Sequence, residues 1–493
     1  MKLAELFKGI PIPAPAPDLE VSFLTENSSK ANAQTVFVCI EGAVHDGHGY
    51  APDAYARGCR VFVTQKEVSL PSDAFLVQVE DTRHTLASLA CHLYENPSHR
   101  MHLIGITGTK GKTTTAQLIA HVLNQNGIPC GYVGTNGISY ANTHIPTKNT
   151  TPDAVTLQET LCEMLAAGVF TAVLEVSSQA LMQYRVDGIR FSTVLFTNLS
   201  FDHIGQNEHP SWEHYKACKH RLFTDFEAET VIYNAEDPAA REMLDATSAK
   251  RLISCSIAST TADVFTTDIT LLRNEEMLGI EFQTTIRKET VPCSLAMIGK
   301  VNAENALLTL AVACEVFAIP LKNAAKSLKS AAVAGRSECV QLPFGACAII
   351  DYAHNETSLR QLLTTLREYR PQRLIALFGS VGERSQLRRR EMGRVAAALC
   401  DLAILTSDNP GNEPPEAIIE EIAEAFAESS TPFLKITDRA EAIRKAISLL
   451  QADDILVLAG KGHENYQLIG TQKIPFSEKA LILEALKEET VIS

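Results

Sequence analysis

Short apolar runs that alternate with amphipathic, helix-like segments are the main pattern along the chain. Several of these runs are followed directly by polar turn residues. The strand-like runs are 35–40, 60–64, 74–79, 172–176, 193–198, 230–234, 346–350, 373–378, 402–406 and 455–459. Repeated strand–helix alternation predicts largely parallel sheets with covering helices, that is, an α/β fold. In such folds, ligands bind at the carboxyl ends of the strands.

The pattern also divides the chain into three parts. At 493 residues the chain is too long for one core and suits about three domains. The break Glu95-Asn96-Pro97-Ser98 ends the first part, and a new strand–helix series begins near residue 332. We therefore predict an α/β domain at 1–97, a central domain with a mostly parallel sheet at 98–331, and a Rossmann-like domain at 332–493.

Composition narrows the possible partners and compartment. A net charge of −14 argues against nucleic acid as a main partner, because binding a polyanion needs a positive field. Twelve cysteines without a Cys-x-x-Cys pair fit reduced thiols better than disulfides or zinc. The start of the chain has no signal-peptide pattern, and no run approaches the length of a membrane span. We predict a soluble, cytoplasmic protein and expect a monomer.

A glycine-rich turn at residues 105–115 is the strongest chemical signal. It reads Gly-Ile-Thr-Gly-Thr-Lys-Gly-Lys-Thr-Thr-Thr and joins a strand-like run to the helix-like segment 116–123. Such a turn cradles phosphate, because the helix N-terminus adds about half a positive charge. The usual first glycine of this motif falls at Ile106, so the loop is a shorter variant. We predict a nucleotide-phosphate site made by Gly108, Thr109, Lys110, Gly111, Lys112, Thr113 and Thr114, with Lys112 on the β/γ-phosphates and Thr113 on Mg²⁺.

Two charged residues stand in apolar surroundings. Glu175 lies within the apolar run 172–176, where a carboxylate is costly unless it has a partner. A Mg²⁺ ion or an internal salt bridge would serve, and the residues alone leave both open. Lys219 lies on the apolar face of the helix-like segment 212–226. It either extends its amine to solvent or has a function, for example near a metal.

Other polar groups follow predicted strands or begin helices. Asp202 and His203 follow one strand, and Asn302 either caps a helix or, with Asn305, reads a base. In the last domain, the clusters 351–355, 408–413 and 460–464 each follow a strand, which predicts one shared cleft. The triplet 388–390 is a solvated helix face or a source of guanidinium groups.

Taken together, these motifs resemble the Mur ligase family, the ATP-dependent enzymes that add amino acids to UDP-N-acetylmuramic acid in peptidoglycan synthesis. The resemblance runs over nearly the whole chain and is closest to the MurE type, which adds the third residue, a diamino acid. It implies a UDP-muropeptide-binding domain, a central P-loop-type ATPase domain and a C-terminal amino-acid-binding domain. The implied partners are UDP-MurNAc-L-Ala-D-Glu and a free diamino acid, and the implied cofactors are ATP and Mg²⁺.

The resemblance also assigns roles to single residues. Residues 107–115 correspond to the ATP loop, Glu175 and His203 to Mg²⁺ ligands, and Lys219 to a lysine that CO₂ carbamylates into a further ligand. Lys112, Lys219 and His203 would be catalytic. The adenine-side contacts would be Asn302 and Asn305, while Arg336 and Asp351 would contact nucleotide and metal-bound phosphate. The muropeptide would contact Ser28, Asn149, Thr150, Thr151, Ser177 and Arg185, and the incoming amino acid would contact His354, Arg389, Asp408, Asn409, Gly460 and Glu464.

The chain departs from the family pattern at four places. The usual Asp-Ser-Arg reads Asn27-Ser28-Ser29, Gln179 replaces a histidine, and the loop 204–210 is longer and different. Enzymes that choose meso-diaminopimelate carry an arginine after Asp-Asn-Pro, where this chain has Gly411. Loss of that guanidinium would remove a contact worth about 1.5–3 kcal/mol. We therefore expect L-lysine to be slightly favoured over meso-diaminopimelate.

Three alternatives remain open. A folylpolyglutamate synthetase-like ligase shares the ATP loop and the modified lysine but normally lacks the first domain. A MurE-like paralogue would keep the chemistry and use another amino acid or substrate. A nucleotide-binding switch or scaffold protein would bind ATP without forming a bond, which Glu175, His203 and Lys219 argue against.

Overall fold

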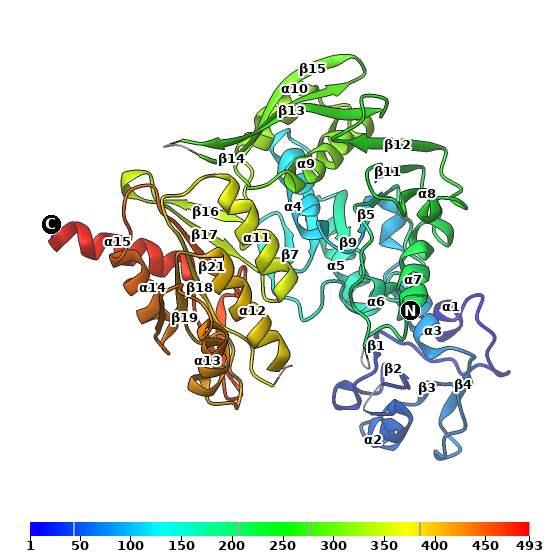
Figure 1. The fold of residues 1–493 in the computed structure, drawn as a ribbon. Coiled ribbons are helices and arrows are strands. Elements are labelled where there is room, and N and C mark those ends of the chain that lie inside the picture. Colours follow the sequence, from blue (N-terminus) through cyan, green and yellow to red (C-terminus); the bar gives the residue numbers. More distant parts are fainter. Residues whose placement is uncertain (43–44, 206–207, 275–276, 384–385, 493) are drawn as a thin grey trace. The chain divides into compact units, whose positions relative to one another are not determined.

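The computed structural model describes residues 1–42, 45–205, 208–274, 277–383 and 386–492 (Figure 1). Internal contacts divide the chain into two compact units. The first unit comprises residues 1–265 and 307–320, and the second comprises 266–306 and 321–493.

The N-terminal part of the first unit is a small α/β layer, drawn in blue in Figure 1. Its four strands are all parallel and lie in the order β1-β2-β3-β4. The longest helix starts where the Asp81 carboxylate accepts the backbone N–H groups of Arg83 and His84. The elements are α1 (Leu3–Leu6), β1 (Phe23–Thr25), η1 (Ser28–Lys30), β2 (Thr35–Val38), η2 (Gly47–Tyr50), α2 (Ala51–Ala56), β3 (Val61–Thr64), β4 (Phe75–Gln78), α3 (Thr82–Leu93) and η3 (Pro97–Arg100).

The rest of the first unit is built on a larger sheet. Its strands lie in the order β12-β11-β10-β5-β9-β6-β7-β8, parallel from β12 to β6 and antiparallel at β7 and β8. Helices α5, α6 and α7 contribute buried side chains to one core with β9 and β10. The elements are β5 (His102–Thr107), α4 (Lys112–Gln125), β6 (Cys130–Gly134), β7 (Gly137–Tyr140), β8 (Thr143–Ile145), α5 (Ala154–Ala166), β9 (Thr171–Glu175), α6 (Ser178–Met182), β10 (Thr193–Phe196), α7 (Trp212–Thr224), β11 (Thr230–Asn234), α8 (Ala240–Met243), β12 (Arg251–Ser256) and the π-helical turn η4 (Val312–Val316).

The second unit contains a sheet ordered β16-β17-β21-β18-β19-β20, parallel except for β16. Alternate residues of β18 face opposite cores, as the two-residue period of a strand requires. Leu374, Ala376 and Phe378 pack with α11, α12 and α13, whereas Ile375 and Leu377 pack with α14 and α15. Helices therefore cover both faces, as Figure 1 also shows.

The remaining helices and strands lie between residues 264 and 492. Strand β13 begins in the first unit and runs into the second, and β14 and β15 form an antiparallel pair. They are β13 (Val264–Arg273), β14 (Leu278–Ile286), β15 (Glu289–Leu295), α9 (Val301–Ala311), α10 (Leu321–Lys329), β16 (Glu338–Gln341), η5 (Pro343–Gly345), β17 (Cys347–Asp351), α11 (Glu356–Glu368), β18 (Leu374–Phe378), α12 (Gln386–Leu399), β19 (Leu402–Leu405), α13 (Pro415–Ala423), η6 (Glu424–Phe426), β20 (Phe433–Lys435), α14 (Arg439–Ser448), β21 (Ile455–Ala459), β22 (Tyr466–Ile469), β23 (Gln472–Pro475) and α15 (Glu478–Ile492).

The predicted α/β fold with parallel-dominated sheets is confirmed. Every predicted strand coincides with an observed one, and the ends differ by at most two residues. The twelve cysteines are all free thiols. Among the described residues, no helix combines the length and apolar character needed to cross a membrane. The three domain bounds stay a prediction.

Candidate functional site

The glycine-rich turn joins β5 to α4 as predicted. Gly111 stands at the N-cap of α4 with φ +84°, and Gly108 has φ +151°. Both glycines thus take backbone conformations that other residues rarely adopt. Their freedom lets the chain leave the sheet and enter the helix within four residues, which brings the positive end of α4 to the carboxyl end of β5.

The end of β10 holds this turn in place. The backbone N–H groups of Thr109 and Lys110 donate to Asn198, at 2.8 and 2.9 Å. The Thr197 hydroxyl donates to the Lys110 carbonyl at 2.7 Å. Two amides of the loop are therefore already used inside the protein. We expect the phosphate-binding amides to come from the first turn of α4 instead.

Two lysine amines meet at one carbonyl oxygen of the loop. Lys112 Nζ donates to the Gly108 carbonyl at 2.7 Å, and Lys219 Nζ donates to the same oxygen at 2.8 Å. Lys219 comes from α7, more than a hundred residues further along the chain. The structure therefore brings together the two lysines that the sequence marked as catalytic candidates.

The environment of Lys219 favours an uncharged amine. The side chain is 1% exposed, and its amine lies 4.7 Å from the centre of the Tyr215 ring. Burial, followed by the charge of Lys112, holds the pKa of Lys219 well below the usual lysine range. The amine therefore loses its proton more readily than an exposed lysine would.

Glu175 ends β9 with no exposed surface and accepts hydrogen bonds at both carboxylate oxygens. One oxygen accepts the Tyr132 hydroxyl at 2.6 Å and the Thr135 N–H at 2.9 Å. The other accepts the Thr113 hydroxyl at 2.8 Å and the Thr135 hydroxyl at 3.2 Å. Among the described residues the carboxylate has no salt-bridge partner, so the internal ion pair considered from sequence is absent there. Thr113 and Glu175, both proposed Mg²⁺ ligands, are in direct contact.

His203 lies near the Tyr215 ring, but its imidazole contacts Glu208. Its side chain is about half exposed, and Nδ1 lies 3.2 Å from a carboxylate oxygen of Glu208. Its ring centre lies 6.0 Å from that of Tyr215, which contacts the Thr109 hydroxyl at 3.0 Å. Its role as a metal ligand stays a prediction. Gln206 and Asn207 of the altered loop lie outside the described residues.

The predicted muropeptide-contacting turn adjoins Glu175. The Thr151 hydroxyl donates to the Glu175 carbonyl at 2.7 Å and accepts the Ser177 N–H at 3.1 Å. Arg185 Nη1 donates to the Thr151 carbonyl at 2.8 Å. Thr150 contacts the Thr135 hydroxyl at 3.1 Å. These side chains therefore form one continuous network beside the loop.

For two further residues predicted to contact the muropeptide, the structure gives only the position in the chain. Asn149 is exposed just before this turn, and Ser28 begins η1 in the N-terminal layer. Gln179, which replaces a family histidine, lies in the short helix α6. Their roles stay predictions.

In the second unit, the two asparagines are paired with each other. Asn305 Nδ2 donates to Asn302 Oδ1 at 2.9 Å, and Asn302 Nδ2 donates to the Ile298 carbonyl at 2.8 Å. Helix α9 begins at Val301, so Asn302 is inside the helix and the N-cap interpretation is wrong. The base-reading interpretation stays a prediction.

Asp351 and Arg336 lie at the end of β17. Asp351 accepts the backbone N–H groups of Ser337 and Ala353 at 2.7 and 2.9 Å. Burial raises the pKa of Asp351, and the charge of Arg336 opposes that rise. The Arg336 guanidinium lies 4.9 Å from the centre of the Tyr352 ring. His354 binds the Tyr352 carbonyl through Nδ1 at 2.7 Å.

A buried lysine joins two of the predicted amino-acid-site clusters. Lys461 Nζ donates to Asn409 Oδ1 at 2.9 Å and lies 3.2 Å from a Glu464 carboxylate oxygen and 3.7 Å from that of Asp408. Asn409 also donates to Glu464 at 2.8 Å. Gly460 has φ +113°, and a Cβ there would stand 2.4 Å from the Asp408 carboxylate, so both backbone and space favour glycine. The predicted clusters 408–413 and 460–464 are thus in contact.

Arg389 is committed to neighbouring carboxylates. Its guanidinium is 1% exposed and lies 2.6 Å from Glu413 and 3.1 Å from Glu421. Glu413 also accepts the Glu383 N–H at 2.9 Å. Arg389 therefore anchors the turn after Asp408, and its predicted contact with the amino acid stays a prediction.

Sequence reasoning missed several residues that position the site. Asn198 holds the loop, and Tyr132 and Thr135 hold Glu175. Each stands within three residues of a strand end, which is the one signal that marks it. Their partners are distant in sequence, so the pattern of the chain gives no reason to single them out.

The approach of Gly108 to β10 yields a first prediction. A Cβ at Gly108 would stand 1.9 Å from the Thr197 hydroxyl oxygen, whereas one at Gly127, also at positive φ, meets nothing within 4 Å. We expect Gly108→Ala to lower the Tm more than Gly127→Ala, by a clash worth about 1–3 kcal/mol. ATP binding measured by calorimetry should weaken only in Gly108→Ala. Equal effects of the two substitutions would contradict this account.

Comparisons with known proteins cover nearly all of the chain. Three family models match: Mur ligase family, catalytic domain (residues 20–94), Mur ligase middle domain (106–313), and Mur ligase, glutamate ligase domain (335–462). A UDP-N-acetylmuramoyl-L-alanyl-D-glutamate–2,6-diaminopimelate ligase of Caldanaerobacter subterraneus subsp. tengcongensis is 36% identical over 489 residues, 99% of each chain.

Solved structures agree with this match. A structure of a UDP-N-acetylmuramoyl-L-alanyl-D-glutamate–2,6-diaminopimelate ligase has a TM-score of 0.73 at 27% identity, covering 99% of this chain and 100% of the other. A Mycobacterium tuberculosis folylpolyglutamate synthase, solved with ADP and AMPPCP, has a TM-score of 0.60 at 18% identity. That match covers 76% of this chain and 92% of the other, and it shows a shared fold.

Proposed function

This chain belongs to the Mur ligase family, and on that premise we propose that it adds a diamino acid, as third residue, to UDP-MurNAc-L-Ala-D-Glu at the expense of ATP. The meeting of Lys112 and Lys219 at the Gly108 carbonyl is the observation that carries the proposal. A loop that merely binds a nucleotide has no need of a second, buried lysine from a distant helix.

The first step activates the terminal carboxylate of the muropeptide. A carboxylate oxygen forms a bond to the γ-phosphorus of ATP, the bond to the β,γ-bridging oxygen breaks, and ADP leaves. Lys112 neutralises charge on the transferring phosphate, and the N-terminus of α4 adds its dipole. Thr151, Ser177 and Arg185, which form one network beside Glu175, orient the muropeptide.

The residues around Glu175 suit a magnesium ion. Thr113 and Glu175 offer a hydroxyl and a carboxylate oxygen 2.8 Å apart, and Mg²⁺ prefers such hard oxygen ligands. We propose Thr113, Glu175, His203 and Lys219 as the residues that hold Mg²⁺. When bound, Mg²⁺ offsets the negative charge of the triphosphate.

For Lys219 we propose carbamylation. Its neutral amine forms an N–C bond to the carbon of CO₂ and releases one proton, which leaves an anionic carbamate. The lowered pKa favours this reaction, because only the unprotonated amine has the lone pair that attacks CO₂. The product replaces a neutral amine by an anionic oxygen ligand at the position where Lys219 reaches the loop.

The second step forms the amide. The amino group of the incoming amino acid attacks the acyl carbon, a tetrahedral intermediate loses a proton, and its collapse expels inorganic phosphate. We propose that Asp408, Asn409 and Glu464 receive the amino acid, with His354, Arg389 and Gly460 around them. Arg336, Asn302 and Asn305 are proposed on the nucleotide side.

One assay tests the proposed activity. Purified protein with ATP, Mg²⁺, UDP-MurNAc-L-Ala-D-Glu and a diamino acid should release ADP and phosphate in equal amounts with the tripeptide product. ATP labelled in its β,γ-bridge should undergo positional isotope exchange when the amino acid is omitted, as reversible acyl phosphate formation requires. ADP release that requires neither the muropeptide nor the diamino acid would favour a nucleotide switch. Turnover of folate glutamates would favour the folylpolyglutamate synthetase alternative.

The choice of amino acid gives a second prediction. Relatives of this chain are named for 2,6-diaminopimelate, whereas Gly411, at φ +59°, offers no guanidinium to a distal carboxylate. We therefore keep the preference for L-lysine over meso-diaminopimelate as a prediction, measured as kcat/KM for each and for ornithine. Gly411→Arg should shift the ratio towards diaminopimelate by about 10–100-fold, the value of one charge-assisted contact. Gly411→Ala controls for backbone strain, and an unshifted ratio in Gly411→Arg would contradict the prediction.

A further inference from the structure

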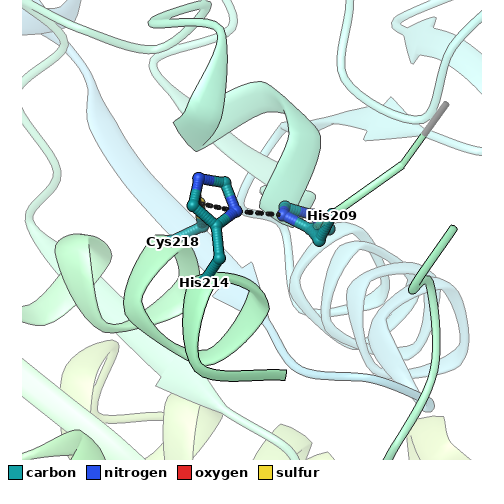
Figure 2. Close-up of side chains that lie close together, drawn as sticks. All are labelled: His209, His214 and Cys218. Carbon is teal, nitrogen blue, oxygen red and sulfur yellow. Dashed lines mark hydrogen bonds between the residues drawn. The ribbon is translucent and has the colours of Figure 1, made fainter. Parts of the chain in front are cut away.

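A second group of potential ligands lies at α7, apart from the oxygen ligands around Glu175. Within the described parts of the chain, His209, His214 and Cys218 have ligand atoms within 4.8 Å of one another (Figure 2). His214 and Cys218 are four residues apart and therefore share one face of α7. His209 approaches from the segment that precedes the helix. None of the three has a role in the proposed ligase reaction.

The three ligand atoms are close enough to converge on one tetrahedral metal centre after side-chain rotation. His209 Nδ1 lies 3.0 Å from His214 Nδ1. Cys218 Sγ lies 3.7 Å from His214 Nδ1 and 4.0 Å from His214 Nε2, so the sulfur lies beside the ring and must turn to meet the Nδ1 lone pair. With Zn–N near 2.0–2.1 Å and Zn–S near 2.3 Å, tetrahedral ligand atoms are about 3.3–3.6 Å apart. The two nitrogens are slightly closer than this, and rotation of the Cys218 side chain would bring its sulfur towards the Nδ1 lone pair of His214. His209 and Cys218 are buried, at 0% and 6% exposure.

A hydrogen bond outside the group orients the first ligand. His209 Nε2 lies 2.8 Å from the hydroxyl oxygen of Ser178. If Nε2 carries the proton and donates it to Ser178, the lone pair of His209 Nδ1 faces His214 Nδ1. Metal-binding histidines are usually fixed by such a bond through their second nitrogen.

The chemistry of the ligands distinguishes this group from the oxygen ligands of the proposed magnesium site. Two imidazole nitrogens and a thiol sulfur select zinc-class cations, whereas carboxylate and hydroxyl oxygens select Mg²⁺. We propose that His209, His214 and Cys218 bind one zinc-class divalent cation, with water as the remaining ligand. The Cys218 thiol loses its proton to solvent on binding, and the cation then cross-links α7 to the segment that carries His209.

Cobalt binding to the full-length, chelator-treated protein tests this assignment in the presence of excess Mg²⁺. The wild type should bind one equivalent of Co²⁺ and show the near-ultraviolet charge-transfer band of a cobalt–thiolate bond. The band should vanish in Cys218→Ser, and His214→Ala should weaken Co²⁺ binding by at least about tenfold. Cys162→Ser and His220→Ala are the matched controls, since Cys162 lies in α5 and His220 on α7 pairs with Asp245.

Each outcome of the cobalt experiment either supports or overturns the proposed site. No saturation at one equivalent, a band retained in Cys218→Ser, or a band lost in Cys162→Ser would overturn the proposal. If Cys218→Ser fails to fold, X-ray absorption of the zinc-loaded wild type replaces it, and one sulfur with two nitrogen ligands is the expected result. A zinc environment without sulfur would overturn the assignment. These readouts do not depend on ligase activity, so they stand or fall separately from the proposed function.

Discussion

Lys219→Met is expected to lower kcat by about 10³-fold, the upper range for losing one electrostatic contact to a transition state. Methionine fills a similar volume but has no nitrogen to donate to the Gly108 carbonyl or to carry a carbamate. Burying the amine costs free energy that offsets its hydrogen bond to the Gly108 carbonyl, and Lys112 also donates to that oxygen. Removing the amine should therefore leave the Tm nearly unchanged. Steady-state ADP release with saturating substrates measures the effect. Lys216→Met, three residues earlier on α7 and paired with Glu242, is the matched control and should retain activity.

The proposed carbamate adds a second readout for Lys219. Wild-type protein incubated with ¹³C-bicarbonate should show one carbamate carbon signal, absent in Lys219→Met and present in Lys216→Met. Lys219→Ala leaves space in which formate or acetate could supply the missing carboxylate, so these anions should partly restore turnover. Full activity of Lys219→Met, or a carbamate signal that survives in it, would remove Lys219 from the mechanism.

Glu175→Gln is expected to lower kcat by about 10²–10³-fold and to weaken the apparent Mg²⁺ affinity. The substitution removes the charge while the hydrogen bonds persist. The amide oxygen can accept the Tyr132 hydroxyl and the Thr135 N–H, as one carboxylate oxygen does now. The amide nitrogen then faces the hydroxyls of Thr113 and Thr135, which can rotate to accept. The fold should therefore survive.

Titration of activity with Mg²⁺, together with the Tm, tests this second expectation. Glu163→Gln is the matched control, because Glu163 accepts the Tyr140 hydroxyl at 2.8 Å in another tyrosine–glutamate pair. That variant should keep both its kcat and its Mg²⁺ dependence. A kcat within about twofold of wild type in Glu175→Gln would show that the buried charge is not needed for catalysis.

The fold followed closely from local sequence patterns. Strands such as β18 and β21 begin and end where their apolar runs do, because burial on both faces demands a continuous apolar stretch. The glycines of the ATP loop were also readable, since a turn from strand to helix restricts its backbone to glycine at Gly108 and Gly111. Both signals depend on a residue and its near neighbours alone.

Part of the candidate site was also predictable, for a related reason. Glu175 and Lys219 stood out because a charge in an apolar run is costly without a partner. The sequence could not identify those partners. For Glu175 they proved to be hydroxyl and amide donors, where a salt bridge had been one alternative. For Arg389 they proved to be Glu413 and Glu421, which hold the guanidinium within a turn.

The sequence by itself determined the order of strands and helices, the ATP loop and the charged residues that need an explanation. Only the tertiary structure decided that Lys219 reaches the carbonyl of Gly108, and that His209, His214 and Cys218 face one another. The physical reason is that periodicity and turn chemistry act over a few residues. A contact across a hundred residues depends instead on how sheets and helices pack, which no local pattern encodes.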